Sequence, residues 1–81
     1  MEIKIVFVGE VSRYAHAQEV QLTITDGSLV SDVLRSVLDS YPDISMISKY
    51  LFIAVNGNLV PRHQMVLPGD EISFFFRSGG G

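Results

Sequence analysis

The last residues of the chain leave almost no group for chemistry other than a terminal carboxylate. They are Arg77, Ser78 and three glycines, Gly79, Gly80 and Gly81. Glycine has no Cβ, so such a segment can enter a channel too narrow for other side chains and can take backbone angles that they cannot. Such a segment would suit a slim arm whose Gly81 carboxylate is activated inside another protein.

Two simpler explanations compete with this one. Most domains have frayed termini, and a run of glycines can be left by an expression vector. If the arm is functional, four or five extended residues reach roughly 13–18 Å, at about 3.3–3.6 Å each. The fold and the family resemblance indicated by the rest of the sequence distinguish between these explanations.

Length and composition predict one soluble domain. A chain of 81 residues, 47% of them hydrophobic, is long enough for a single compact core. The sequence has no cysteine, which excludes disulfides and thiolate metal sites. It has no apolar run near membrane-spanning length, and its first residues do not open a signal peptide, so we expect a cytoplasmic protein with no membrane partner. A net charge of −3 with scattered basic residues argues against nucleic acid as a partner.

Other candidate sites are weak. His16 and His63 lack the spacing of metal ligands, and exposed loop histidines are the simpler interpretation. Asp70 and Glu71 form part of a turn signal more readily than an acid–base pair. No nucleophile with a base and no phosphate-binding glycine motif can be found. We therefore expect no metal and no cofactor bound by this chain.

The first half of the chain predicts two strands and a helix. Residues 2–8 and 18–25 alternate as strands and are joined by a loop over 9–17. Gly27 supplies a turn, and Ser28 is the expected N-cap of a helix over 29–41. Its apolar residues recur every three or four positions, and Pro42 ends it. Residues 43–50 are irregular, with room for one short helical turn.

The second half predicts three further strands. Residues 51–56 form one, and Asn56-Gly57 is a strong hairpin signal because both turn positions need positive φ. A short strand at 59–60 follows, and the last strand covers 71–76. The order strand, strand, helix, strand, short strand, strand indicates an α+β domain of the β-grasp, or ubiquitin-like, type. We expect a mixed sheet of four to five strands, one main helix on one face, the domain at 1–76 and a flexible glycine tail at 77–81.

The alternation of the last strand bears on partner binding. If the apolar residues at 72, 74 and 76 face the helix, then Phe75 joins Val6 and Val8 on the open face of the sheet. A contiguous exposed apolar patch usually marks a protein interface, although a loop could also cover one of these rows. Arg77 could steer an acidic partner, with solvated surface charge as the simpler interpretation.

The pieces in order resemble the MoaD/ThiS sulfur-carrier proteins, which are prokaryotic relatives of ubiquitin. The resemblance covers nearly the whole chain, and it is carried by these segments: residues 3–8, Asp26 to Leu34, Val55-Asn56-Gly57, Pro68 to Ile72, Phe74-Phe75 and the terminal glycines. Tyr41-Pro42 and residues 70–75 look like the small subunit of molybdopterin synthase, whereas residues 56–62 look more like the thiamine carrier. The sequence departs from the family in having no proline in the approach to the glycines and in ending on three glycines rather than two.

The resemblance implies a non-catalytic carrier rather than an enzyme. Gly81 would be adenylated by an E1-like adenylyltransferase, to which ATP and Mg²⁺ belong, and a sulfur donor protein would convert it to a thiocarboxylate. Ser78, Gly79 and Gly80 would thread the partner's active site. Val6, Val8, Phe75 and Arg77 would form the partner interface. The expected pathway is molybdenum cofactor synthesis, with the large subunit of molybdopterin synthase as partner. Thiamine thiazole synthesis, tRNA thiolation, protein modification and an inert binding module are the alternatives.

Overall fold

A computed structural model describes residues 1–76, which build a sheet with helices on one side of it. The elements in chain order are β1 (Glu2–Phe7), α1 (Val11–Ala15), β2 (Glu19–Thr23), α2 (Val30–Ser40), α3 (Pro42–Ser45), a 3₁₀ turn at Ser48–Tyr50, β3 (Leu51–Val55), β4 (Asn58–Leu59) and β5 (Glu71–Phe76). No helix among the described residues is long and apolar enough to cross a membrane.

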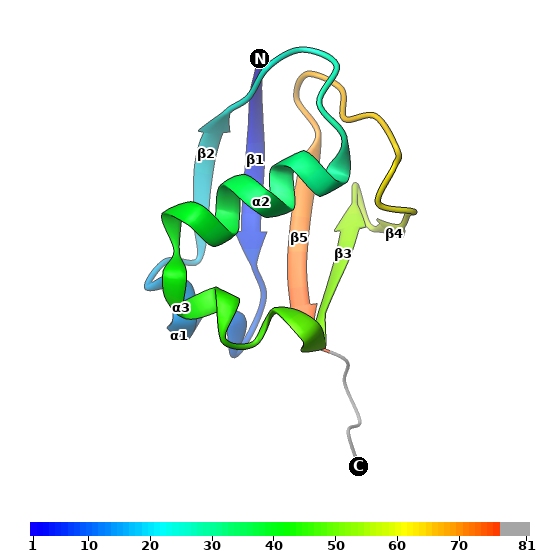
Figure 1. Cartoon of the computed structure of the whole chain (residues 1–81). Helices are drawn as coiled ribbons and strands as arrows, with labels where there is room; N and C mark the ends of the chain where they lie inside the picture. Colours follow the sequence, from blue (N-terminus) through cyan, green and yellow to red (C-terminus); the bar gives the residue numbers. More distant parts are fainter. Residues whose placement is uncertain (77–81) are drawn as a thin grey trace.

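The five strands follow the order β2-β1-β5-β3-β4 (Figure 1). β1 and β5 lie side by side and run parallel, with Ile5 opposite Ile72 and Phe7 opposite Phe74. The other neighbouring pairs are antiparallel. The predicted β-grasp fold, with the first and last strands at the centre of a mixed sheet, is confirmed. The last strand therefore leads into residues 77–81 from the middle of the sheet, not from an edge.

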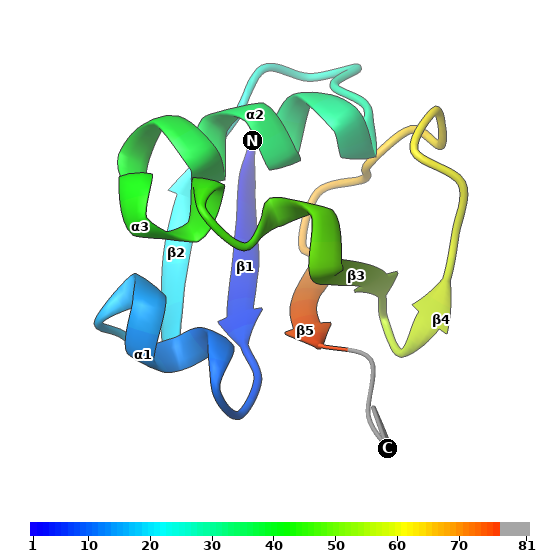
Figure 2. The ribbon, with the colours of Figure 1, turned by 60° about the horizontal axis from the view of Figure 1, so that its bottom comes forward.

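Helix α2 crosses one face of this sheet and closes the core (Figure 1). Val33 and Val37, at helical spacing, are buried against the inward residues of the strands. Helices α1 and α3 lie on the β1–β2 side of the molecule (Figure 2). The fully buried side chains, all apolar, are Ile3, Ile5, Val11, Val30, Val33, Val37, Ile44, Val66, Ile72 and Phe74.

The loop predicted over residues 9–17 is wrong in part, because it contains α1. Val11 and Ala15 face the core, with exposed fractions of 0% and 3%. A single turn of helix carries too few residues for a periodic signal, and such a helix is not stable alone. Its stability comes from burial of these two side chains against the rest of the core.

The start of α2 also differs from the prediction, since Ser28 is not its N-cap. Leu29 holds that position, and its N–H donates to Asp32 Oδ2 at 2.8 Å. The Ser28 hydroxyl instead donates to the carbonyl of Thr25 at 2.6 Å. Distant backbone completes the helix start: the N–H of Val30 donates to the carbonyl of Gln64 at 3.0 Å. The helix start is therefore satisfied partly by the nearby Asp32 carboxylate and partly by a distant loop, and the local sequence encodes only the first of these contacts.

The end of α2 and the β3–β4 turn follow the prediction closely. The helix ends at Ser40, and Pro42 opens the short helix α3. At the turn, Asn56 and Gly57 have φ values of 51° and 86°, as the hairpin signal requires. The fourth strand begins one residue earlier than predicted and comprises Asn58–Leu59, without Val60.

Candidate functional site

The sheet face turned away from α2 is called here the open face. Its residues follow from the register, because neighbours of buried residues along a strand point to the other side. Val6 of β1 lies opposite Ser73 of β5, which lies opposite Ala54 of β3. In the next row Phe75 lies opposite Phe52. The strands therefore bring Val6 and Phe75, two of the residues predicted for a partner interface, to the same face.

Aromatic stacking gives this face a rigid centre. The rings of Phe52 and Phe75 stack with centroids 5.9 Å apart and an interplanar angle of 24°. The N–H of Val8 donates to the carbonyl of Phe74 at 2.9 Å, which continues the parallel ladder and places Val8 beside Phe75. Val8 is 45% exposed.

We call Val6, Val8, Phe52 and Phe75 the apolar patch. Sequence reasoning identified three of these residues and missed Phe52. All residues from Leu51 to Val55 are apolar, so alternation along β3 gives no sign of which side chains face outward. Only the pairing of Phe52 with Phe75 of β5 shows that Phe52 faces outward, and the sequence of β3 does not reveal this pairing. Leu59 of β4, opposite Ala54, adds a further exposed apolar side chain at the edge of this face.

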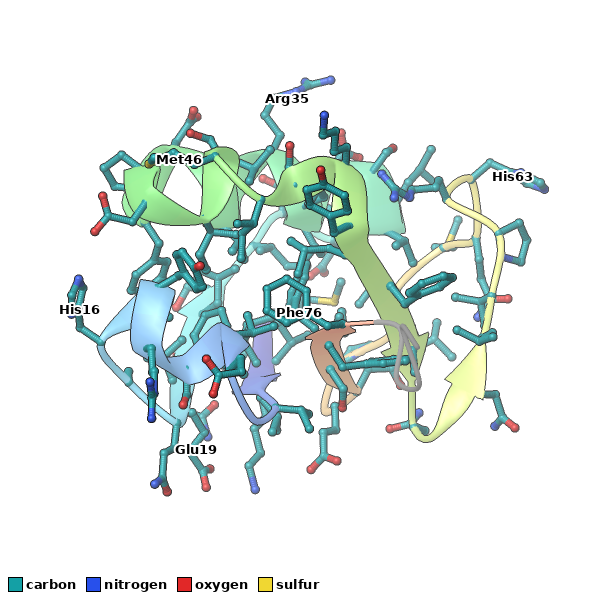
Figure 3. The ribbon with its side chains drawn as sticks, turned by 90° about the horizontal axis from the view of Figure 1, so that it is seen from below. His16, Glu19, Arg35, Met46, His63 and Phe76 are labelled. Carbon is teal, nitrogen blue, oxygen red and sulfur yellow. The ribbon has the colours of Figure 1, made fainter. Side chains whose placement is uncertain are left out.

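The far end of the open face is charged. Lys4 Nζ lies 3.1 Å from Glu19 Oε2 and 3.7 Å from Glu71 Oε1. The hydrogen bond that Lys4 donates to Glu19, followed by the charges of both glutamates, raises the pKa of Lys4 above its ordinary value. Figure 3 shows Glu19 on the side of the sheet opposite to Arg35, which lies beyond α2. The open face is thus divided into an ionic half and an apolar half, and the apolar half lies at the end where β5 finishes.

A cleft of about 700 Å³ adjoins the apolar patch. Phe76 is the last residue of β5 and is labelled in Figure 3. Its ring packs edge-on against that of Tyr14 of α1, with centroids 6.2 Å apart and an interplanar angle of 86°. Phe52 belongs to both the patch and the cleft. The cleft is lined by Tyr14, Ile47, Lys49, Tyr50, Leu51, Phe52 and Phe76. Apolar surface thus continues around the start of β3 to the residue that precedes the glycine arm.

The remaining predicted site residues fall on the arm. Arg77, Ser78, Gly79, Gly80 and Gly81 lie outside the described residues, so their roles stay predictions. Within residues 1–76 the chain order puts Phe76 directly before them. Any partner that holds Gly81 therefore works within reach of the end of β5, roughly 17 Å for five extended residues.

Asp70 has a structural role. Its carboxylate accepts hydrogen bonds from Asn56 Nδ2 and from the N–H of Leu67, both at 2.9 Å. The residue is only 9% exposed. A buried carboxylate with two such donors ties the β3–β4 turn to the turn before β5. This agrees with the prediction that Asp70 and Glu71 belong to turn chemistry.

Neither histidine lies in a metal-like cluster. His16 Nε2 lies 3.2 Å from Asp43 Oδ2, and both side chains are exposed. His63 is exposed in the connection before β5. Within residues 1–76 no group of three or more histidine, aspartate or glutamate side chains could hold a metal ion.

Known proteins share both the sequence pattern and the fold of this chain. A model of the ThiS family matches residues 5–81. No curated protein sequence matches this chain. SAMP1 from Haloferax volcanii has a similar structure, with 16% identity, 100% of each chain covered and a TM-score of 0.90.

Two further solved structures resemble the chain. The putative molybdopterin converting factor subunit 1 from Pyrococcus furiosus has 18% identity, covers 94% of this chain and 97% of its own, and has a TM-score of 0.88. A complex of subunits 1 and 2 of the molybdopterin-converting factor from Helicobacter pylori has 21% identity, 100% of each chain covered and a TM-score of 0.74. At these identities the likeness establishes the shared fold.

Proposed function

This chain belongs to the ThiS family, and we propose that it is a sulfur-carrier protein whose Gly81 carboxylate is adenylated and then converted to a thiocarboxylate. One observation carries the proposal. The apolar patch lies on the open face beside the end of β5, the central strand that continues into the glycine arm. A partner that docks on the patch would have the terminal carboxylate within reach of its active site.

The chemistry needs little from this chain beyond docking and access. A carboxylate is a poor electrophile until one of its oxygens becomes part of a good leaving group. In the proposed sequence the Gly81 carboxylate attacks the α-phosphate of ATP, pyrophosphate leaves, and a sulfur nucleophile then displaces AMP. The partner supplies ATP and Mg²⁺. The chain supplies a terminus without side chains, which can thread a narrow channel, and a face that positions it.

The apolar patch is suited to docking. Phe52 and Phe75 are large, partly exposed and held by mutual stacking, so little side-chain entropy remains to be lost on binding. Aromatic side chains near the centre of an interface are frequent hot spots. The E1-like adenylyltransferase and the partner that consumes the sulfur both need the same arm, and we infer that they use this patch in turn.

Molybdenum cofactor synthesis is the pathway we propose first. The similar structure from Helicobacter pylori is a complex of subunits 1 and 2 of the molybdopterin-converting factor, and the one from Pyrococcus furiosus is described as a putative subunit 1. By analogy, the large subunit of molybdopterin synthase would be the partner here, with a sulfur donor protein upstream. Thiamine thiazole synthesis and tRNA thiolation use the same carrier chemistry and differ only in this final partner.

Protein modification is the second candidate. The structural likeness to SAMP1 extends over the full length of both chains with a TM-score of 0.90, and a similar structure from Methanosarcina acetivorans is described as small archaeal modifier protein 1. In that case an amine, not sulfur, would capture the adenylated Gly81. The two functions share activation and differ in the nucleophile.

Intact mass spectrometry tests the proposal. After incubation with the cognate adenylyltransferase, ATP, Mg²⁺ and a sulfur donor, the mass should rise by the difference between one sulfur and one oxygen atom. Deletion of Gly81 should abolish this change. Replacing Gly80 with phenylalanine should leave docking intact but block the reaction, because the channel cannot admit a side chain. An unchanged wild-type mass with a competent activating enzyme would exclude the carrier function.

A further inference from the structure

The chain has few amines, and the structure separates them. Besides the α-amino group of Met1 there are only two lysines, Lys4 and Lys49. An amine must be unprotonated and accessible to attack an activated carboxylate. The surroundings of each amine therefore decide which of the three can be acylated.

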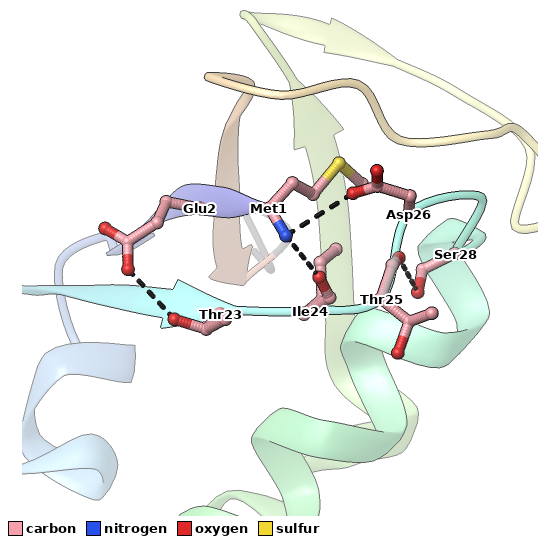
Figure 4. Close-up of polar contacts among 7 residues, drawn as sticks. All are labelled: Met1, Glu2, Thr23, Ile24, Thr25, Asp26 and Ser28. Carbon is pink, nitrogen blue, oxygen red and sulfur yellow. Dashed lines mark hydrogen bonds and ion pairs between the residues drawn. The ribbon is translucent and has the colours of Figure 1, made fainter.

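Two of the three amines are engaged. The Met1 ammonium donates to the carbonyl of Ile24 at 2.7 Å and lies 3.4 Å from Asp26 Oδ1 (Figure 4). Lys4 bridges Glu19 and Glu71 on the open face. These glutamates hold Lys4 in its charged form, and each unit by which a lysine pKa rises lowers its unprotonated fraction about tenfold. Both amines are therefore held by contacts within residues 1–76.

Lys49 differs from both. It is exposed, and no carboxylate within residues 1–76 forms an ion pair with it. Its Nζ lies over the ring of Tyr50, 5.2 Å from the ring centroid. A cation–π contact at an exposed site is weak, so the Lys49 amine stays accessible to a reacting group.

Lys49 also lines the cleft described above. The walls of this cleft include the rings of Tyr14, Tyr50 and Phe76. Flat apolar walls beside a free amine suit a segment that has no side chains of its own. The terminal glycines of a second copy of this chain are such a segment.

We propose that Lys49 is an acylation site, which accepts the activated Gly81 carboxylate of a second copy to form an isopeptide bond. This rests on the proposed activation of Gly81. The unprotonated Nζ attacks the carbonyl carbon of the acyl adenylate, and the bond from that carbon to the phosphate oxygen breaks. AMP leaves with the electron pair, and the new amide nitrogen loses one proton to solvent. No oxidant or reductant is needed.

The acceptor is a second copy for a geometric reason. An activating enzyme docked on the apolar patch of the donor would also cover Phe52, which the patch shares with the cleft. The donor's own Lys49 would then lie at the margin of the occupied surface. A free copy presents its cleft unobstructed.

The test uses the full chain, the cognate adenylyltransferase, Mg²⁺ and ATP, with no sulfur donor. We expect a covalent dimer on a denaturing gel and, after trypsin, a Lys49 peptide that carries residues 78–81, because trypsin cleaves after Arg77. Lys49→Arg should remove the dimer. Lys4→Arg is the matched control and should leave it unchanged, since arginine keeps the ion pairs with the two glutamates.

Two further measurements keep the inference separate from the proposed function. ATP–pyrophosphate exchange reports activation of Gly81 in every variant. Exchange without a Gly81–Lys49 bond overturns the inference and leaves the proposed function standing; absence of exchange overturns both. Limiting N-hydroxysuccinimide acetate, which needs no enzyme, should acetylate Lys49 before Lys4, because the two glutamates hold Lys4 in its charged form. Equal labelling of the two lysines would also contradict the proposal.

Discussion

The two faces of the sheet use similar side chains for different purposes. Along β5, Ile72 and Phe74 point to α2 and are 0% exposed, whereas Ser73 and Phe75 point to the open face and are only partly covered. Two phenylalanines adjacent in sequence thus lie in opposite environments. An apolar residue under α2 stabilises the fold, and an apolar residue on the open face is available to a partner.

The open face itself is not uniform. The charged groups of its ionic half are paired within the chain. Lys4 forms ion pairs with Glu19 and Glu71, and Thr23 Oγ1 donates to Glu2 Oε1 at 2.9 Å. Among the described residues, the side chains of its apolar half form no hydrogen bond or ion pair. This half borders the end of β5. This face therefore has an ionic half whose charges pair within the chain and an apolar half that we propose as the partner surface. Single substitutions can test this division.

The largest effect is expected under the helix. Phe74→Ala should lower the free energy of unfolding by about 3–5 kcal/mol, the usual cost of removing a buried phenylalanine ring. Denaturant unfolding followed by circular dichroism measures this. Phe75→Ala is the matched control one residue away, and equal costs for the two would contradict the assignment of faces.

The second largest effect is expected for Asp70→Ala, which should lower the free energy of unfolding by about 1–3 kcal/mol. The substitution leaves two donors, Asn56 Nδ2 and the N–H of Leu67, without their acceptor in a largely buried site. Asn56→Ala would not isolate this contact, because Asn56 Oδ1 also accepts a hydrogen bond from the N–H of Glu71 at 3.0 Å and Asn56 has a φ of 51°. If Asp70→Ala unfolds at the wild-type denaturant midpoint, the carboxylate does not hold the two turns together.

Phe75→Ala should weaken partner binding by about 1–3 kcal/mol, as expected for an aromatic anchor. Its effect on stability should be smaller, about 0.5–1.5 kcal/mol for the lost stack on Phe52. Calorimetric titration with the adenylyltransferase measures binding, and Leu22→Ala, on the covered side of β2, serves as control. Unfolding of Phe75→Ala with normal binding by the folded fraction would place Phe75 in the core.

The smallest effect is expected for Lys4→Met in the ionic half. Because the pKa of Lys4 is raised in the folded state, its contribution to stability is present below the ordinary lysine pKa and is lost as pH rises through the folded-state value. The variant should be slightly less stable than wild type at neutral pH and low salt. This difference should vanish at strongly alkaline pH and in about 1 M salt, where the Debye length is about 3 Å. Persistence under both conditions would show that packing, not charge, is responsible.

Local signals predicted most of the fold but only part of the site. The alternation of 18–25, the helical spacing after Leu29 and the Asn56-Gly57 turn lie within short windows. They were sufficient for the order of the strands and the main helix, but not for α1. Phe75, Val6 and Val8 could be placed because their strands alternate. Phe52 could not be placed, since every residue around it is apolar and only the pairing with β5 distinguishes its side from that of Ile53.

The sequence alone determined the features that depend on neighbouring residues: periodicity, turn geometry at positive φ, and the run of three glycines at residues 79–81. The tertiary structure decided those that depend on residues far apart in the chain. Helix α1 is stabilised because Val11 and Ala15 are buried in the core. Asp70 accepts a hydrogen bond from Asn56, which is fourteen positions away in the chain. The chemical difference between Lys4 and Lys49 has the same origin, because the glutamates that engage Lys4 are brought to it by two neighbouring strands.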